Sequence, residues 1–138
     1  MEEIDIFLRD VKEGCKITEP AYENFYVGER RVCMLGAILY RKGKLECPNR
    51  VLTPSQNAIA SHLFRLHPFL KKRTEITGIK IEDGFLLTTT LGSWPPSKLT
   101  WVNLASRFWD SGLFKTREIC AEFLVWLYKG IEGHSVLF

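Results

Sequence analysis

The chain has 138 residues, of which 46% are hydrophobic and 12% aromatic, and its formal net charge at pH 7 is +3. A chain of this size and composition can bury roughly two thirds of its unfolded surface, which excludes a mainly disordered protein. It contains no uncharged apolar stretch of about 18 residues, so no membrane-spanning helix is expected. These properties predict a single domain over residues 1–138.

Charge is unevenly distributed along the chain. The net charge is −4 over residues 1–28, +8 over residues 29–80 and −1 over residues 81–138. A basic middle third can bind phosphate, nucleic acid or an acidic protein surface. The competing interpretation is that these cations pair with the protein's own acidic N-terminal segment, or are simply solvated.

The N-terminal residues and the cysteines indicate the compartment. The first ten residues are acidic and amphipathic, unlike the basic start and apolar run of a signal peptide. The four cysteines are widely spaced: Cys15, Cys33, Cys47 and Cys120. We therefore expect reduced thiols in a cytoplasmic protein.

Hydrophobic periodicity predicts the first helix over residues 3–13. Ile4, Phe7, Leu8 and Val11 lie on one helical face, and Gly14 follows as a stop.

The second element is expected to be deeply buried. Residues 32–40 carry no charge, and cations flank them on both sides. A helix over residues 32–41 would be apolar on nearly every side and would lie centrally in the fold. Gly36 in its middle suggests close approach to a neighbouring backbone, and Gly43 provides its end. A short buried strand is the alternative, because periodicity does not separate the two.

The remaining elements follow from caps and turns. Thr53 is placed to cap a helix that Pro68 ends. Residues 78–90 alternate in polarity around an Asp83-Gly84 turn, which predicts an antiparallel β-hairpin. Two more helices are expected, one over residues 99–109 and one from Thr116 to Gly130. Together the elements predict one compact, mostly helical α+β domain with one antiparallel β-hairpin.

The candidate binding site combines a basic segment with an aromatic loop. Four cations fall within residues 61–73, and Trp94 lies in a loop with two prolines, where its ring would be exposed. The residues expected to bind a partner are Arg65, His67, Lys71, Lys72, Arg73 and Trp94.

We find no complete catalytic or cofactor motif. The leading hypothesis is therefore a small, non-enzymatic binding or regulatory protein whose partner is an acidic protein surface or a nucleotide phosphate. A nucleic-acid-binding protein that uses the same patch is the alternative. A hydrolase that depends on Cys33 is a third possibility. No cofactor, metal site or membrane partner is expected, since no Cys or His pair has zinc-ligand spacing.

Two fragments resemble a family of small uncharacterised bacterial and phage proteins. Residues 31–37, Arg-Val-Cys-Met-Leu-Gly-Ala, resemble its R-x-C-x-L-G-A element, which follows an N-terminal helix. Residues 108–110 and 116–119 resemble its W-N-D element and its final helix. The order matches over most of the chain, although the Asn of W-N-D is missing and the central hairpin is not part of the family pattern. The resemblance implies a small cytoplasmic domain from a phage or mobile element, and brings no activity with it.

Overall fold

The computed structural model of the protein describes residues 2–22, 30–43, 56–83, 85–90 and 99–132. The elements in chain order are α1 (Glu3–Cys15), β1 (Glu19–Pro20), β2 (Arg31–Val32), α2 (Met34–Arg41), α3 (Gln56–Leu66), the 3-10 helix η1 (Pro68–Lys71), β3 (Ile76–Glu82), β4 (Phe85–Thr90), α4 (Trp101–Asp110) and α5 (Arg117–Glu132).

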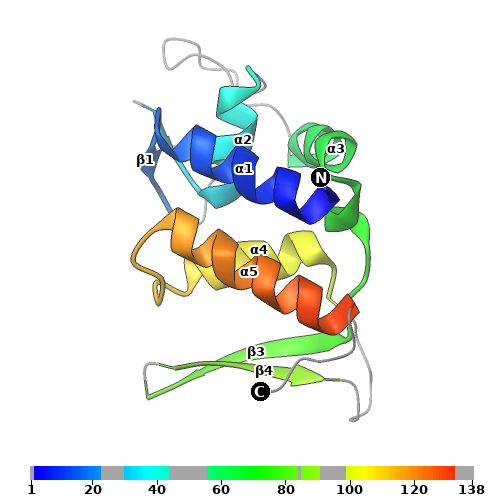
Figure 1. Ribbon diagram of the computed structural model, residues 1–138. Coiled ribbons are helices and arrows are strands. Elements are labelled where there is room, and N and C mark those ends of the chain that lie inside the picture. The colour runs from blue at the N-terminus through cyan, green and yellow to red at the C-terminus, as the bar shows by residue number, and fades with distance from the viewer. Residues whose placement is uncertain (1, 23–29, 44–55, 84, 91–98, 133–138) are drawn as a thin grey trace.

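The helices form the body of the molecule and the hairpin forms a layer beside them (Figure 1). α1 packs against both α2 and α5, and α4 packs against α2 and α5 from another side. The strands β3 and β4 lie below α4 and α5 in Figure 1. The expectation of a mostly helical α+β fold is confirmed.

The structure contains two small sheets rather than the one that was predicted. β3 pairs with β4 in antiparallel register, and Asp83 takes a positive φ of 50° at the turn between them. β1 and β2 form the second sheet, which is parallel and joins Glu19 to Arg31 and Pro20 to Val32. The prediction of a single antiparallel hairpin is therefore incomplete. Two-residue strands have no periodicity from which to predict them.

α2 is the buried helix that the sequence predicts, and the strand alternative is wrong. All of its residues from Met34 to Leu39 are buried. Gly43 follows it with a φ of 69°, which fits a glycine after a helix C-terminus. The close backbone approach, however, involves Gly14 of α1. A Cβ built at Gly14 would lie 2.2 Å from the carbonyl oxygen of Ala37 in α2.

Helix ends differ from the prediction by a few residues. α1 continues through Gly14 to Cys15, and α5 continues through Gly130 to Glu132. Thr116 caps α5 as expected, because its Oγ1 accepts a hydrogen bond from the Ile119 amide at 3.1 Å. The predicted cap at Thr53 lies outside the described residues.

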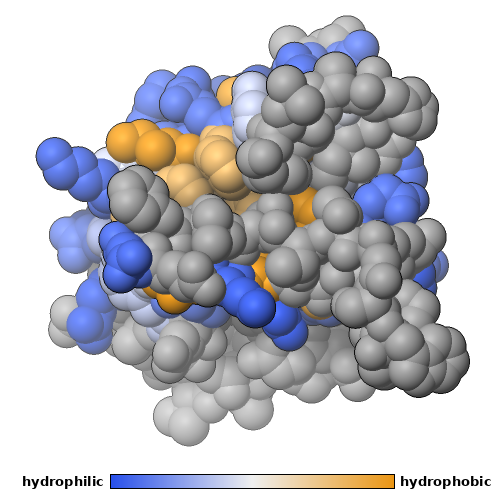
Figure 2. Space-filling model, turned by 90° about the horizontal axis from the view of Figure 1, so that it is seen from below, coloured by the Kyte–Doolittle hydropathy of each residue, from blue (hydrophilic) through white to orange (hydrophobic). Residues whose placement is uncertain are grey.

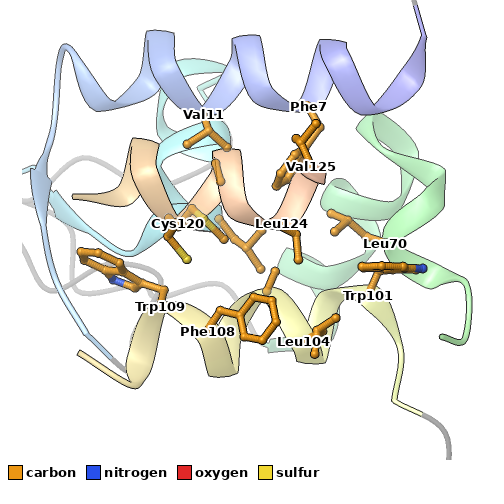
Figure 3. Packing of buried hydrophobic residues seen from close by; sticks show 14 of the residues in the cluster. Phe7, Val11, Leu70, Trp101, Leu104, Phe108, Trp109, Cys120, Leu124 and Val125 are labelled. Atoms are coloured by element: carbon orange, nitrogen blue, oxygen red, sulfur yellow. The ribbon is translucent and has the colours of Figure 1, made fainter. Parts of the chain in front are cut away.

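One hydrophobic core connects the helices. Figure 3 shows Phe7 and Val11 of α1 pointing toward Leu124 and Val125 of α5, while Leu104 and Phe108 rise from α4 on the other side. The buried cluster also includes residues of α2, α3, η1 and β3. η1 is thus part of the core through its apolar residues, even though its neighbours are strongly charged.

Candidate functional site

Four of the predicted binding residues, Arg65, Lys71, Lys72 and Arg73, are exposed, and we call them the basic edge. They lie where the chain leaves α3, passes through η1 and approaches β3, at the right of Figure 1. Their positive charges therefore face solvent from one continuous part of the chain.

The backbone that carries the basic edge is fixed on both sides. Phe69 is buried within η1, and its carbonyl accepts a hydrogen bond from the Lys72 amide at 3.0 Å. The Lys72 carbonyl in turn accepts from the Trp101 amide at the start of α4, also at 3.0 Å. Arg73 forms a backbone bridge with Thr100. These bonds hold three consecutive cations in place without using their side chains.

Two side chains of the basic edge contact aromatic rings. Arg65 Nη2 lies 3.0 Å from Nδ1 of the His62 ring. Lys72 Nζ lies 5.8 Å from the centre of the Tyr128 ring, within range of a cation–π contact.

His67 does not belong to the exposed surface, contrary to the prediction, because it is only 1% exposed. The chain turns inward between α3 and η1, which brings Nε2 of His67 to 3.0 Å from Oδ2 of Asp10. The ring N–H is not aligned for a well-directed hydrogen bond, and Nδ1 has no hydrogen-bond partner among the described residues. Burial lowers the pKa of His67, although the nearby Asp10 carboxylate opposes this effect. His67 is therefore neutral at pH 7.

Asp10 is the centre of a buried charge cluster that our sequence analysis missed. Its side chain is 3% exposed, and Oδ1 lies 3.5 Å from Arg41, 3.6 Å from Arg9 and 3.9 Å from Lys42. Arg41 also pairs with Glu13 at 2.5 Å. One signal was present in the sequence, because residue 10 falls on the apolar face of α1. A carboxylate on such a face needs a buried partner.

Trp94, the aromatic member of the predicted site, lies outside the described residues. Two phenylalanines lie inside the basic segment: Phe64 is half-buried and packs against the core, whereas Phe69 is 1% exposed and packs against the rings of Phe7 and Tyr128. It is therefore not presented to a nucleic-acid base.

Cys33 serves as the N-cap of α2. Its Sγ accepts a hydrogen bond from the Gly36 amide at 3.3 Å. Burial raises the pKa of the Cys33 thiol to about 11 and that of Cys15 to about 12, and it also raises the pKa of Cys120. Such thiols are overwhelmingly protonated at neutral pH, which weighs against a nucleophilic role.

The described parts of the chain contain no cluster of three or more His, Cys, Asp or Glu residues that could hold a metal ion. Among the helices described, none is long and apolar enough to cross a membrane.

A shallow hollow of about 380 Å³ lies between the hairpin and α4. Ile79 and Ile81 of β3 line one side, and Ser106, Arg107, Asp110 and Ser111 line the other. Ile81 is 51% exposed, so the hairpin covers the helices only loosely. Among the coloured atoms seen from below, a hydrophobic area lies next to hydrophilic side chains at the upper left of Figure 2. The hollow is open and has a mixed polar and apolar lining, which does not specify a ligand.

No protein-family model, curated protein or solved structure matches this chain.

Proposed function

We propose that this chain is a small binding protein that recognises an acidic protein surface through the basic edge. The observation that supports this proposal is the row of three exposed cations, Lys71, Lys72 and Arg73, on a backbone fixed by hydrogen bonds to the start of α4. Cations held on a rigid backbone lose little backbone freedom on binding, and their charge accelerates encounter with an acidic partner.

The same cations would attract phosphates, so nucleic-acid binding is the alternative to test. Single-stranded nucleic acid is usually bound with aromatic side chains on which the bases stack. At this edge Phe69 is buried, and Tyr128 is half-buried near Lys72. These positions favour an acidic protein as the partner over a nucleic acid.

The test compares the affinities of an acidic peptide and a single-stranded oligonucleotide of equal charge. Fluorescence anisotropy would measure both at about 50 and 200 mM salt. The double variant Lys71→Glu/Arg73→Glu should bind the peptide at least about tenfold more weakly at low salt. The matched control is Lys16→Glu/Lys115→Glu, which changes the net charge equally at exposed positions elsewhere.

Each outcome decides between the hypotheses. Peptide binding that is lost in the edge variant and retained in the control supports the proposal. Equal losses in both variants, or no peptide binding at all, contradict it. Tighter oligonucleotide binding with a steep salt dependence favours the nucleic-acid alternative. Far-UV circular dichroism would establish that each variant is folded.

A further inference from the structure

A buried histidine connects the basic edge to α1. His67 lies between the last residue of α3 and Pro68, which begins η1. Its carbonyl accepts a hydrogen bond from the Leu70 amide at 3.1 Å, and its own amide donates to the Leu63 carbonyl at 2.8 Å. The position of the His67 backbone therefore fixes where η1 starts.

The contacts of η1 with α1 are concentrated around the His67 ring. The Phe7 ring of α1 packs edge-on against the rings of His67 and Phe69. The distances between ring centres are 5.5 Å to His67 and 5.2 Å to Phe69. The amide of Phe69 donates to Oε1 of Glu3 at 2.5 Å. Since Phe7 packs against both rings, a displacement of His67 would also disturb the contact of η1 with α1.

Charged residues surround the His67 ring, so its interactions depend on whether the ring carries a proton. From α1, Asp10 and Glu3 favour a proton on His67, while Lys42 of α2 opposes it. The oxygen of Asp10 that does not face His67 is already close to Arg9, Arg41 and Lys42. A protonated His67 would therefore be the fourth cation beside the Asp10 carboxylate, whose charge the other three already largely neutralise. The charged ring would also be buried away from water and would lose its hydration.

We propose that the His67–Asp10 contact is a proton-operated latch. When His67 takes up a proton, η1 separates from α1 and the basic edge is held only by its remaining contacts, among them the backbone hydrogen bond to the start of α4. The separation of η1 can be measured without a partner, whereas its effect on binding rests on the proposed function.

The direction of the pH effect follows from burial. The pKa of His67 lies below its ordinary value of 6.5 because burial disfavours the charged ring. A histidine whose pKa is lower in the folded than in the unfolded protein stabilises the fold fully at a pH above its pKa in the unfolded state. This stabilisation is lost as the pH falls through its pKa in the folded state. The latch is therefore closed at neutral pH and opens on acidification below 6.5.

Amide hydrogen exchange followed by NMR would test the latch. The amides of Phe69, Leu70 and Lys72 report on η1, and those of Leu104 and Leu124 report on the core, each corrected for intrinsic exchange. Between pH 7.5 and pH 5 we expect protection of the η1 amides to fall at least tenfold while protection of the core amides is retained. The latch is wrong if η1 is unchanged, or if η1 and the core lose protection together.

The variant His67→Gln should abolish the pH dependence at η1, since glutamine fills a similar space and does not titrate. The matched control is His62→Gln, because His62 is the half-buried histidine of α3 that contacts Arg65. A pH dependence that survives in His67→Gln, or disappears in His62→Gln, would overturn the assignment.

A second measurement on the unaltered protein covers the case in which His67→Gln does not fold. NMR titration of the imidazole rings should show the loss of η1 protection following the titration of His67. The latch is contradicted if η1 follows another histidine. If η1 opens but the affinity for the acidic peptide is unaffected, the separation of η1 is supported and its effect on binding is contradicted, while the proposed function is decided separately by the edge variant.

Discussion

Replacing Gly14 by alanine should force α1 and α2 apart. An ideal Cβ at position 14 would lie 2.2 Å from the carbonyl oxygen of Ala37 and 2.5 Å from its carbonyl carbon. Real Cβ contacts are essentially never shorter than 3.0 Å, so the two backbones would have to separate by about 0.8 Å. The crowding atoms belong to a helical backbone, which cannot rotate away as a side chain can.

The expected cost follows from two opposing effects. Overpacking a core costs about 1–3 kcal/mol, and a clash with backbone falls near the upper end of that range. Alanine has a better helix propensity than glycine, which returns at most about 1 kcal/mol. We therefore expect Gly14→Ala to lower the free energy of unfolding by about 2 kcal/mol. For a chain of this length the corresponding drop in Tm is about 6–8 °C.

Thermal and urea unfolding monitored by circular dichroism would measure this effect. Gly112→Ala is the control for backbone strain without crowding, since Gly112 has a φ of 74° and its Cβ would meet nothing within 4 Å. Adding Ala37→Gly to Gly14→Ala should not restore stability, because the clash is with the backbone of residue 37. A Gly14→Ala protein as stable as the original, or one fully rescued by Ala37→Gly, would refute the reasoning.

Three further substitutions or labelling experiments test other parts of the structure. The guanidinium of Arg117 is buried and donates hydrogen bonds to Thr18 and to the Val32 carbonyl. Arg117→Lys should therefore destabilise the fold by about 2–3 kcal/mol in urea unfolding; an equal effect from Arg107→Lys, at an exposed position, would contradict this. Iodoacetamide labelling at pH 7.5, mapped by mass spectrometry, should modify Cys33 at least about a hundredfold more slowly in the folded protein than in urea. The reason is that a rise in the thiol pKa from 9.0 to about 11 on folding lowers the thiolate fraction by that factor. Similar rates in the two states would show that the thiol is not buried. Asp5→Asn should change the free energy of unfolding by about 0.5 kcal/mol or less, because its pair with Lys129 at 3.1 Å is solvent-accessible; a loss above about 1 kcal/mol would mean that this pair matters more than its exposure suggests.

Periodicity was sufficient to predict the helices but not their exact ends. The apolar positions Ile4, Phe7 and Val11 are all buried, as expected for one face of α1. The stop expected at Gly14 failed because this glycine is needed inside the helix, where α2 approaches. A glycine that ends a helix and a glycine that admits a neighbour look alike in a sequence. Only the positive φ of Gly43 or the crowding at Gly14 tells them apart.

The candidate site could be predicted only as far as charge determines exposure. Lys71, Lys72 and Arg73 are exposed because three adjacent cations cannot all be buried. A histidine such as His67 is less polar than these cations, so it can be either buried or exposed. In the fold its ring lies 3.0 Å from the carboxylate of Asp10, a residue far from it in the sequence. No local pattern around His67 contains that information.

Two fragments that lie far apart in the sequence, residues 31–37 and residues 116–119, meet in space. Arg117 is 4% exposed, and its guanidinium donates to the Val32 carbonyl at 3.2 Å and to the Thr18 carbonyl at 2.9 Å. Val32 belongs to the first fragment and Arg117 to the second, while Thr18 directly precedes β1. The guanidinium thus ties the start of α5 to both strands of the parallel pair. Cys33, the next residue after Val32, then caps α2. These fragments stabilise the helical body, and the residues proposed to bind a partner lie outside them. A relative that shared the fragments alone would be expected to share this junction, while its binding surface would depend on whether it also carries cations at the positions of the basic edge.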